Sequence, residues 1–89
     1  MEKIVFTDHA LFEMKRRGLP REIIEKIITE PEQQWEVRKG RMVLQSRIPF
    51  GDTAEVYLVR VFMEIDRNPP EIVTAYKTSK IEKYWRGEK

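Results

Sequence analysis

The chain contains no cysteine among its 89 residues. A disulfide framework and a thiolate metal site are therefore both excluded. No apolar run approaches the length of about 20 residues that a membrane span needs. No long apolar segment follows the charged first residues, as it would in a signal peptide. We therefore expect a cytoplasmic protein without membrane association, whose core forms by packing alone.

Charge of one sign is also scarce, because 36% of the residues are charged but the net charge is only +2. The strongly basic balance of an obligate nucleic-acid binder is missing. The basic residues nevertheless gather in two groups, one after residue 14 and one in the last part of the chain. These groups are Lys15, Arg16, Arg17 and Arg21, and Lys77, Lys80, Lys83, Arg86 and Lys89. Each group favours a local basic patch.

Two helices are predicted near the start of the chain. Thr7 is a good N-cap, and Gly18 is the expected left-handed stop after a helix that ends near Arg17. Pro20 suits the first position of a second helix, because no amide hydrogen is needed there, and Pro31 ends it. The apolar face of this second helix consists of Ile23, Ile24, Ile27 and Ile28.

After Pro31 the apolar residues alternate with polar ones, which predicts strands over residues 35–38, 42–48, 54–65 and 72–78. Gly40 is expected to take a positive φ in the first hairpin turn, and residues 54–65 read as a central strand because both faces are apolar. Short turns favour an antiparallel meander.

The ends of the chain complete the predicted fold. Residues 3–6 are expected to be extended, and a capping box from Ser79 to Glu82 predicts a short C-terminal helix. Eighty-nine residues form one domain, with enough apolar residues for one layer of helices on one sheet. The predicted class is α+β, with two N-terminal helices on a four-stranded antiparallel sheet and a short C-terminal helix.

Several local residues accompany this order of elements. They are His9-Ala10, Met14, Arg17-Gly18, Pro31, Gly40 and Val73-Thr74-Ala75-Tyr76. Together they resemble a bacterial and archaeal domain-of-unknown-function family over nearly the whole chain. That family is commonly grouped with the RelE-, ParE- and BrnT-like toxins of toxin–antitoxin pairs, many of which cut RNA. It often has an arginine just before the methionine, where this chain has Glu13.

The resemblance implies a single RelE/BrnT-like domain over residues 1–89, RNA as the target and a small acidic antitoxin as a partner. Metal-free RNA cleavage needs a proton acceptor, a proton donor and cations for the phosphorane charge. We therefore expect no metal and no other cofactor. His9, the only histidine, is a candidate acid or base because its ordinary pKa lies near neutrality. Its structural alternative is a first-turn residue bound to a backbone carbonyl or to a neighbouring carboxylate.

Arg60 interrupts an apolar face of the strand predicted over residues 54–65. A buried, unpaired guanidinium is costly. Arg60 therefore either pairs with a carboxylate or opens onto a cleft, and we favour the cleft. Tyr76, on the last strand, is a candidate for positioning the base or assisting proton transfer, or else a rim aromatic. His9, Arg60 and Tyr76 form the predicted catalytic set.

Substrate binding is assigned to Arg17, Thr74, Lys77 and Lys80. Arg17 suits a phosphate, although a cation at a helix end also complements the helix dipole. The lysines suit an RNA backbone or a solvated helix face. Trp35 and Trp85 are expected in the core.

The predicted function is a toxin-like, metal-independent endoribonuclease of a toxin–antitoxin pair. The alternative is a non-catalytic protein-binding module that uses an exposed strand edge or the first helix. ParE-like action on another target, without nuclease activity, is a third interpretation.

Overall fold

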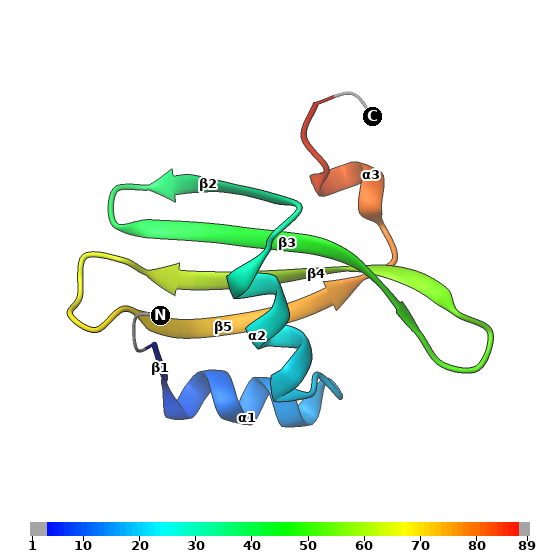
Figure 1. The fold of residues 1–89 in the computed structure, drawn as a ribbon, viewed down its shortest axis with the longest axis horizontal. Helices are drawn as coiled ribbons and strands as arrows, with labels where there is room; N and C mark the ends of the chain where they lie inside the picture. Colours follow the sequence, from blue (N-terminus) through cyan, green and yellow to red (C-terminus); the bar gives the residue numbers. More distant parts are fainter. Residues whose placement is uncertain (1–3, 88–89) are drawn as a thin grey trace.

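The computed structural model describes residues 4–87 of the chain. Eight elements follow one another along it (Figure 1). They are β1 (Val5–Phe6), α1 (Asp8–Arg16), α2 (Arg21–Thr29), β2 (Gln33–Arg38), β3 (Arg41–Phe50), β4 (Glu55–Glu64), β5 (Glu71–Thr78) and α3 (Ile81–Tyr84). The predicted α+β class is confirmed.

The sheet has five strands in the order β1-β5-β4-β3-β2, so the predicted number of four was wrong. Strands β2 to β5 form the expected antiparallel meander. The additional strand, β1, pairs in parallel with β5. The Val5 amide donates to the Pro70 carbonyl and the Thr7 amide to the Ile72 carbonyl, both at 3.0 Å. A parallel neighbour is possible here because the long intervening chain supplies the required crossover.

Local signals define the first helix as predicted. The Thr7 hydroxyl accepts a hydrogen bond from the Ala10 amide at 3.1 Å, which caps α1. Gly18 has a φ of +68°, the left-handed conformation expected of a residue that ends a helix. Pro20 lies one position before α2 rather than at its first residue, because the Pro20 backbone is still extended.

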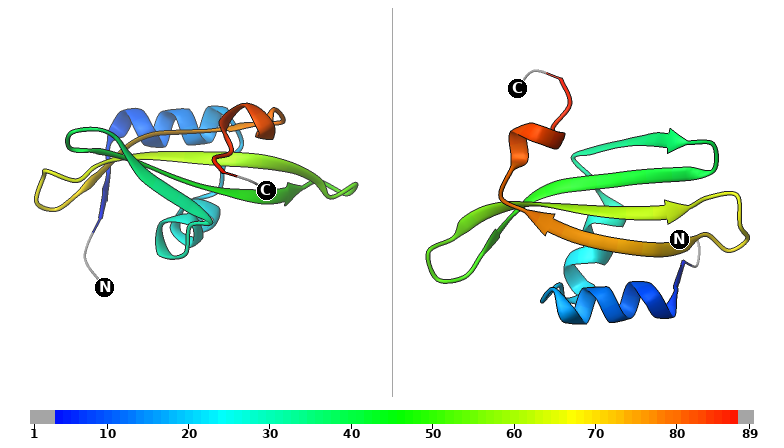
Figure 2. Two further views of the ribbon diagram at one scale, coloured as in Figure 1. Left: turned by 90° about the horizontal axis from the view of Figure 1, so that it is seen from above. Right: turned by 180° about the vertical axis from the view of Figure 1, so that it is seen from behind.

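The main hydrophobic core lies between helices α1 and α2 and one face of the sheet, which we call the helix face. Helix α1 contacts β5, and α2 contacts β3 and β4 (Figures 1 and 2). Ile24 and Ile27 of α2 are buried together with Leu44, Val59 and Val61 of the sheet. Since side chains alternate along a strand, the residues between these sheet positions point to the opposite face.

The C-terminal segment lies on that opposite face, so α2 and α3 are on different sides of the sheet (Figure 2, left). The capping box predicted for α3 is wrong: Lys80 precedes the helix, and no side chain caps it. Instead, the Thr78 hydroxyl accepts from the Lys80 amide at 3.0 Å. Among residues 4–87, no helix is long and apolar enough to cross a membrane.

The β2–β3 hairpin turn is formed as predicted, with Gly40 at a φ of +83°. A Cβ at this position would lie 2.7 Å from Oδ2 of Asp66, so a larger residue would require the Asp66 side chain to move in addition to the strained φ. The β3–β4 pair then sets the register from Arg41 opposite Glu64 to Phe50 opposite Glu55. This register places Gln45 opposite Arg60.

Candidate functional site

A row of three polar side chains crosses the sheet on the face opposite α2. Gln45 of β3, Arg60 of β4 and Tyr76 of β5 are direct cross-strand neighbours. Arg60 Nε donates to Oε1 of Gln45 at 2.8 Å, and Arg60 Nη1 donates to the Tyr76 hydroxyl at 2.9 Å. We call this side of the sheet the Arg60 face.

Aromatic rings surround the Arg60 guanidinium. Its Cζ lies 4.4 Å from the ring centroid of Tyr84, 5.4 Å from that of Phe62 and 5.9 Å from that of Tyr76. Such distances allow cation–π attraction. Arg60 is only 8% exposed, whereas the three aromatic residues are half-buried. The charge therefore lies beneath a partly accessible aromatic surface.

Strand β4 buries a second charged side chain, Glu64, on the same face as Arg60. Glu64 is 5% exposed, and its carboxylate pairs with Arg41 and with Arg38. Arg60 takes part in none of the ion pairs found among residues 4–87. Two arginines therefore compensate the buried carboxylate of Glu64, whereas the buried guanidinium of Arg60 has only neutral partners among the described residues.

Among residues 4–87, neither environment that the sequence offered for Arg60 is observed. Arg60 has no carboxylate partner in the described part of the chain, and Tyr84 of the C-terminal segment lies over it where an open cleft was expected. The physical reason is that an amide oxygen and a phenol oxygen can accept hydrogen bonds from a guanidinium without neutralising it. Hydrogen bonding is satisfied, but the charge is not compensated.

Tyr76 lies where the sequence predicted, next to Arg60. Thr74 is opposite Phe62 on the same face and is half-buried. Because the Tyr76 oxygen accepts from Arg60, the phenolic proton of Tyr76 is free to be donated to another group. Chemically, the row offers a fixed cation beside a hydroxyl donor, although catalysis by these residues stays a prediction.

His9 is exposed in the first turn of α1, the helix that lies along β5. Among the described residues, no hydrogen bond joins it to Arg60 or Tyr76. Its charge acts on Glu13 instead, four residues further along the helix. The Arg16 hydrogen bond is the largest cause that lowers the pKa of Glu13, and the charges of Arg16, Arg17 and His9 act in the same direction against the effect of burial.

Arg17 has a structural role in this fold. Its Nη1 donates to the backbone carbonyl of Ala75 on β5 at 2.8 Å, and its Nη2 lies 2.9 Å from Oε1 of Glu13. β1 pairs only as far as Ile72, so Arg17 binds a carbonyl further along the same strand edge. The predicted phosphate contact would have to compete with both of these partners.

The two candidate lysines are not brought together with Arg60. Lys77 lies opposite Val59, on the helix face, with its Nζ 4.4 Å from the Phe50 ring centroid and 5.2 Å from that of Tyr57. Lys80 is exposed beside α3 and lines a shallow open hollow with four neighbouring residues, Ser79, Ile81, Glu82 and Lys83. Neither lysine contributes to the Arg60 row.

Two members of the site escaped the sequence analysis. Gln45 was read as an ordinary strand residue, yet it is fully buried and accepts from Arg60. Its place opposite Arg60 follows from the observed β3–β4 register, which the predicted strand ends do not give. Tyr84 carries no sequence signal, because only the fold brings the C-terminal segment over β4. Metal binding gains no support, since residues 4–87 contain no group of three suitable His, Asp or Glu side chains.

Trp35 and Trp85 were wrongly expected in the core. Both are half-buried, each with a guanidinium over its ring: Arg86 over Trp35 and Arg47 over Trp85, both at 4.1 Å. The strand carrying Trp35 is at the sheet edge, and Trp85 follows a helix with no buried residue, so neither position is enclosed on all sides.

Comparison with known proteins gives one match. The family described as Domain of unknown function (DUF4258) matches residues 6–77, from the second residue of β1 to the last but one residue of β5. No curated protein and no solved structure matches the chain. The resemblance to a domain-of-unknown-function family is thus confirmed, while its grouping with toxins stays a prediction. The chain belongs to the DUF4258 family.

Proposed function

We propose that this chain is a toxin-like, metal-independent endoribonuclease that binds the RNA backbone on its Arg60 face. The observation that carries the proposal is the charge of Arg60, which is 8% exposed and, within residues 4–87, hydrogen-bonded only to neutral side chains. A guanidinium in such surroundings favours an anionic ligand, because a phosphate supplies the negative charge that the side chains around Arg60 lack. Half-buried aromatic rings around the cation suit the stacking of unpaired bases.

The geometry of the row supports the following roles. Arg60 stabilises the negative charge that develops on the phosphate during attack by the 2′-hydroxyl. Tyr76 donates its free phenolic proton to the leaving oxygen, while Gln45 positions Arg60. His9 on α1 accepts the proton of the attacking 2′-hydroxyl from an RNA strand that spans the distance between the sheet and α1, as the bond from phosphorus to the leaving oxygen breaks. Expected partners are RNA and a small acidic antitoxin encoded next to this gene, and the expected compartment is the cytoplasm.

The test uses the full chain and a single-stranded RNA of mixed sequence in a buffer with a metal chelator. Arg60→Met and Tyr76→Phe should each lower the cleavage rate by about 10²-fold or more, the usual scale for a lost charge-stabilising or acid group. Arg21→Met is the matched control, because it removes an equal charge at an exposed site paired with an exposed Glu25. Wild-type protein that neither cleaves RNA nor is toxic on expression would refute the proposal, as would full activity in both variants.

A non-catalytic protein-binding module remains the second candidate, and a different observation favours it. Helix α1 exposes two neighbouring apolar side chains, with Phe12 63% and Leu11 40% exposed. Exposed large apolar residues often mark a binding surface. Phe12→Ser should abolish capture of a host partner if this interpretation is right, and RNA cleavage should be unaffected. An unchanged partner with Phe12→Ser would remove this candidate.

A further inference from the structure

The segment after β5 crosses the Arg60 face and covers the guanidinium. We call residues 81–87 the strap. Its Tyr84 ring lies 4.4 Å above Cζ of Arg60 and packs edge-on against Tyr76 at a centroid distance of 6.3 Å. The family match ends at residue 77, so the strap lies outside the part of the chain that defines the family.

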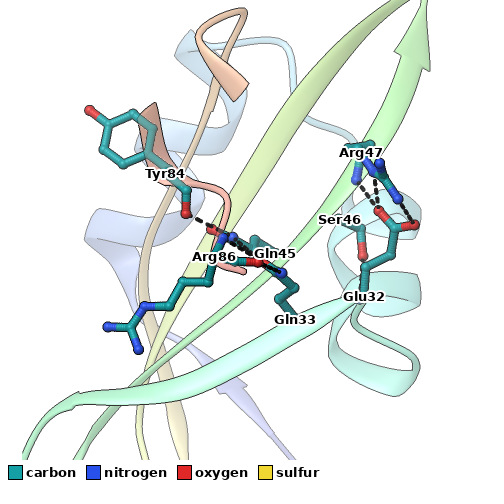
Figure 3. A network of polar contacts seen from close by, with 7 residues as sticks. All are labelled: Glu32, Gln33, Gln45, Ser46, Arg47, Tyr84 and Arg86. Atoms are coloured by element: carbon teal, nitrogen blue, oxygen red, sulfur yellow. Dashed lines mark hydrogen bonds and ion pairs between the residues drawn. The ribbon is translucent and has the colours of Figure 1, made fainter. Parts of the chain in front are cut away.

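Two glutamine side chains of the sheet hold the strap through its backbone (Figure 3). Gln33 donates through Nε2 to the Arg86 carbonyl at 2.6 Å and accepts from the Arg86 amide at 3.1 Å. Gln45 donates through Nε2 to the Tyr84 carbonyl at 3.2 Å and to Oε1 of Gln33 at 2.8 Å. Gln45 therefore touches both the strap and Arg60.

Apart from these hydrogen bonds, the strap contacts the sheet mainly through cation–π pairs at the surface: Arg60 under Tyr84, Arg47 over Trp85 and Arg86 over Trp35. None of the four residues of α3 is buried, and the helix has no side-chain cap. Trp85 rests under Arg47, whose guanidinium Glu32 fixes through contacts of 3.0 Å from Nε to Oε1 and from Nη2 to Oε2. A segment without buried apolar anchors opens at low free-energy cost.

We propose that the strap is a displaceable cover of the Arg60 site, so that anions reach the guanidinium only in the minor, open state. The regulatory meaning of this cover rests on the proposed function, whereas the opening itself does not. In the open state Arg60 keeps Gln45 and Tyr76 as partners and loses only the Tyr84 ring. Apparent affinity for RNA is then reduced by the fraction of molecules in the open state.

The first experiment measures opening without RNA. A dicarbonyl reagent such as phenylglyoxal modifies guanidinium groups, and mass spectrometry reports the rate at Arg60 separately from that at the exposed Arg21. Gln33→Ala removes both hydrogen bonds to the Arg86 backbone, which corresponds to about a tenfold shift toward the open state. The rate at Arg60 should rise by about tenfold and the rate at Arg21 should not change.

Gln34→Ala is the matched control, since Gln34 is exposed, precedes Trp35 and points to the helix face opposite Leu44. Trp85→Ala loosens the strap at a separate point and guards against a folding effect of the first variant. Equal Arg60 modification rates in wild type, Gln33→Ala and Trp85→Ala would overturn the proposal.

The second experiment measures affinity for a single-stranded RNA oligonucleotide in the same variants. Gln33→Ala and Trp85→Ala should bind it about tenfold more tightly than wild type or Gln34→Ala. Faster modification of Arg60 with unchanged affinity would refute a regulatory role of the strap. Faster modification with no RNA binding by any variant would instead refute the proposed function, and with it the control of RNA access.

Discussion

Arg60→Met tests whether the buried guanidinium stabilises or destabilises the folded state. Methionine keeps an unbranched apolar chain in the same place and removes the charge. The variant loses the donor to Gln45, which is fully buried, at a cost of about 1–3 kcal/mol. It also loses the attraction to the Tyr84 ring, about 0.5–2 kcal/mol. Against this, several kcal/mol of desolvation penalty disappear with the charge. We expect the free energy of unfolding to change by less than about 2 kcal/mol.

Gln45→Leu tests the same buried charge by removing its hydrogen-bond acceptor and keeping the guanidinium. Here the guanidinium stays buried but loses the acceptor of its Nε hydrogen bond. A buried charged group left without its hydrogen-bond acceptor costs about 1–3 kcal/mol or more, and the variant also loses the Gln45 hydrogen bonds to Gln33 and to the Tyr84 carbonyl. The single variant Gln45→Leu should therefore be less stable than Arg60→Met, although it removes no charge. The double variant should recover part of the loss, because no unpartnered cation remains.

Urea unfolding followed by far-ultraviolet circular dichroism measures all three variants against wild type, with the slope checked for a constant unfolded state. A loss of more than about 4 kcal/mol in the free energy of unfolding of Arg60→Met would refute this expectation, since the guanidinium would then stabilise the fold. The expectation also fails if Gln45→Leu is no worse than Arg60→Met, or if the two losses simply add.

Three further predictions concern α1. Arg17→Met should lower stability by about 1–3 kcal/mol in urea unfolding, because it leaves the Ala75 carbonyl without its donor; a loss below about 0.3 kcal/mol would refute the structural role. Thr7→Ala should cost about 1 kcal/mol by the same assay through loss of the cap on Ala10, and Thr7→Ser should restore most of it. The pKa of Glu13 is lowered from its usual value of 4.5, so its carboxylate stabilises the folded state above that pH, and this stabilisation disappears as the pH falls through the folded pKa. The stability advantage of wild type over Glu13→Gln should therefore shrink between about pH 6 and pH 3, and a constant advantage would contradict this prediction.

Local sequence signals predicted most of the elements, because each rests on nearby residues. Thr7 and Gly18 bound α1 through a cap and a left-handed residue, and Gly40 marks the hairpin through its positive φ. β1 was missed as a sheet member because two residues are too few to show an alternating pattern. Its pairing depends on α1 packing along β5, which no local signal encodes.

The site could be predicted only in part for a similar reason. An arginine within an apolar strand is visible in the sequence, and a meander places Tyr76 beside it. The neutral partner Gln45 follows from the exact pairing of β3 and β4, and the Tyr84 ring arrives from a segment far along the chain. The sequence could thus locate the cation, but it could predict neither the charge of the side chains around it nor how far they cover it.

The placement of Glu13 changes which residues can act on a phosphate. The Glu13 carboxylate binds both Arg16 and Arg17. Those two cations are therefore already paired within α1, and Arg17 is further bound to the edge of β5. Arg60, on the sheet, has no such counter-charge among the described residues. Because an incoming phosphate need not displace a carboxylate there, the proposed anion site lies on the Arg60 face and not at the basic end of α1.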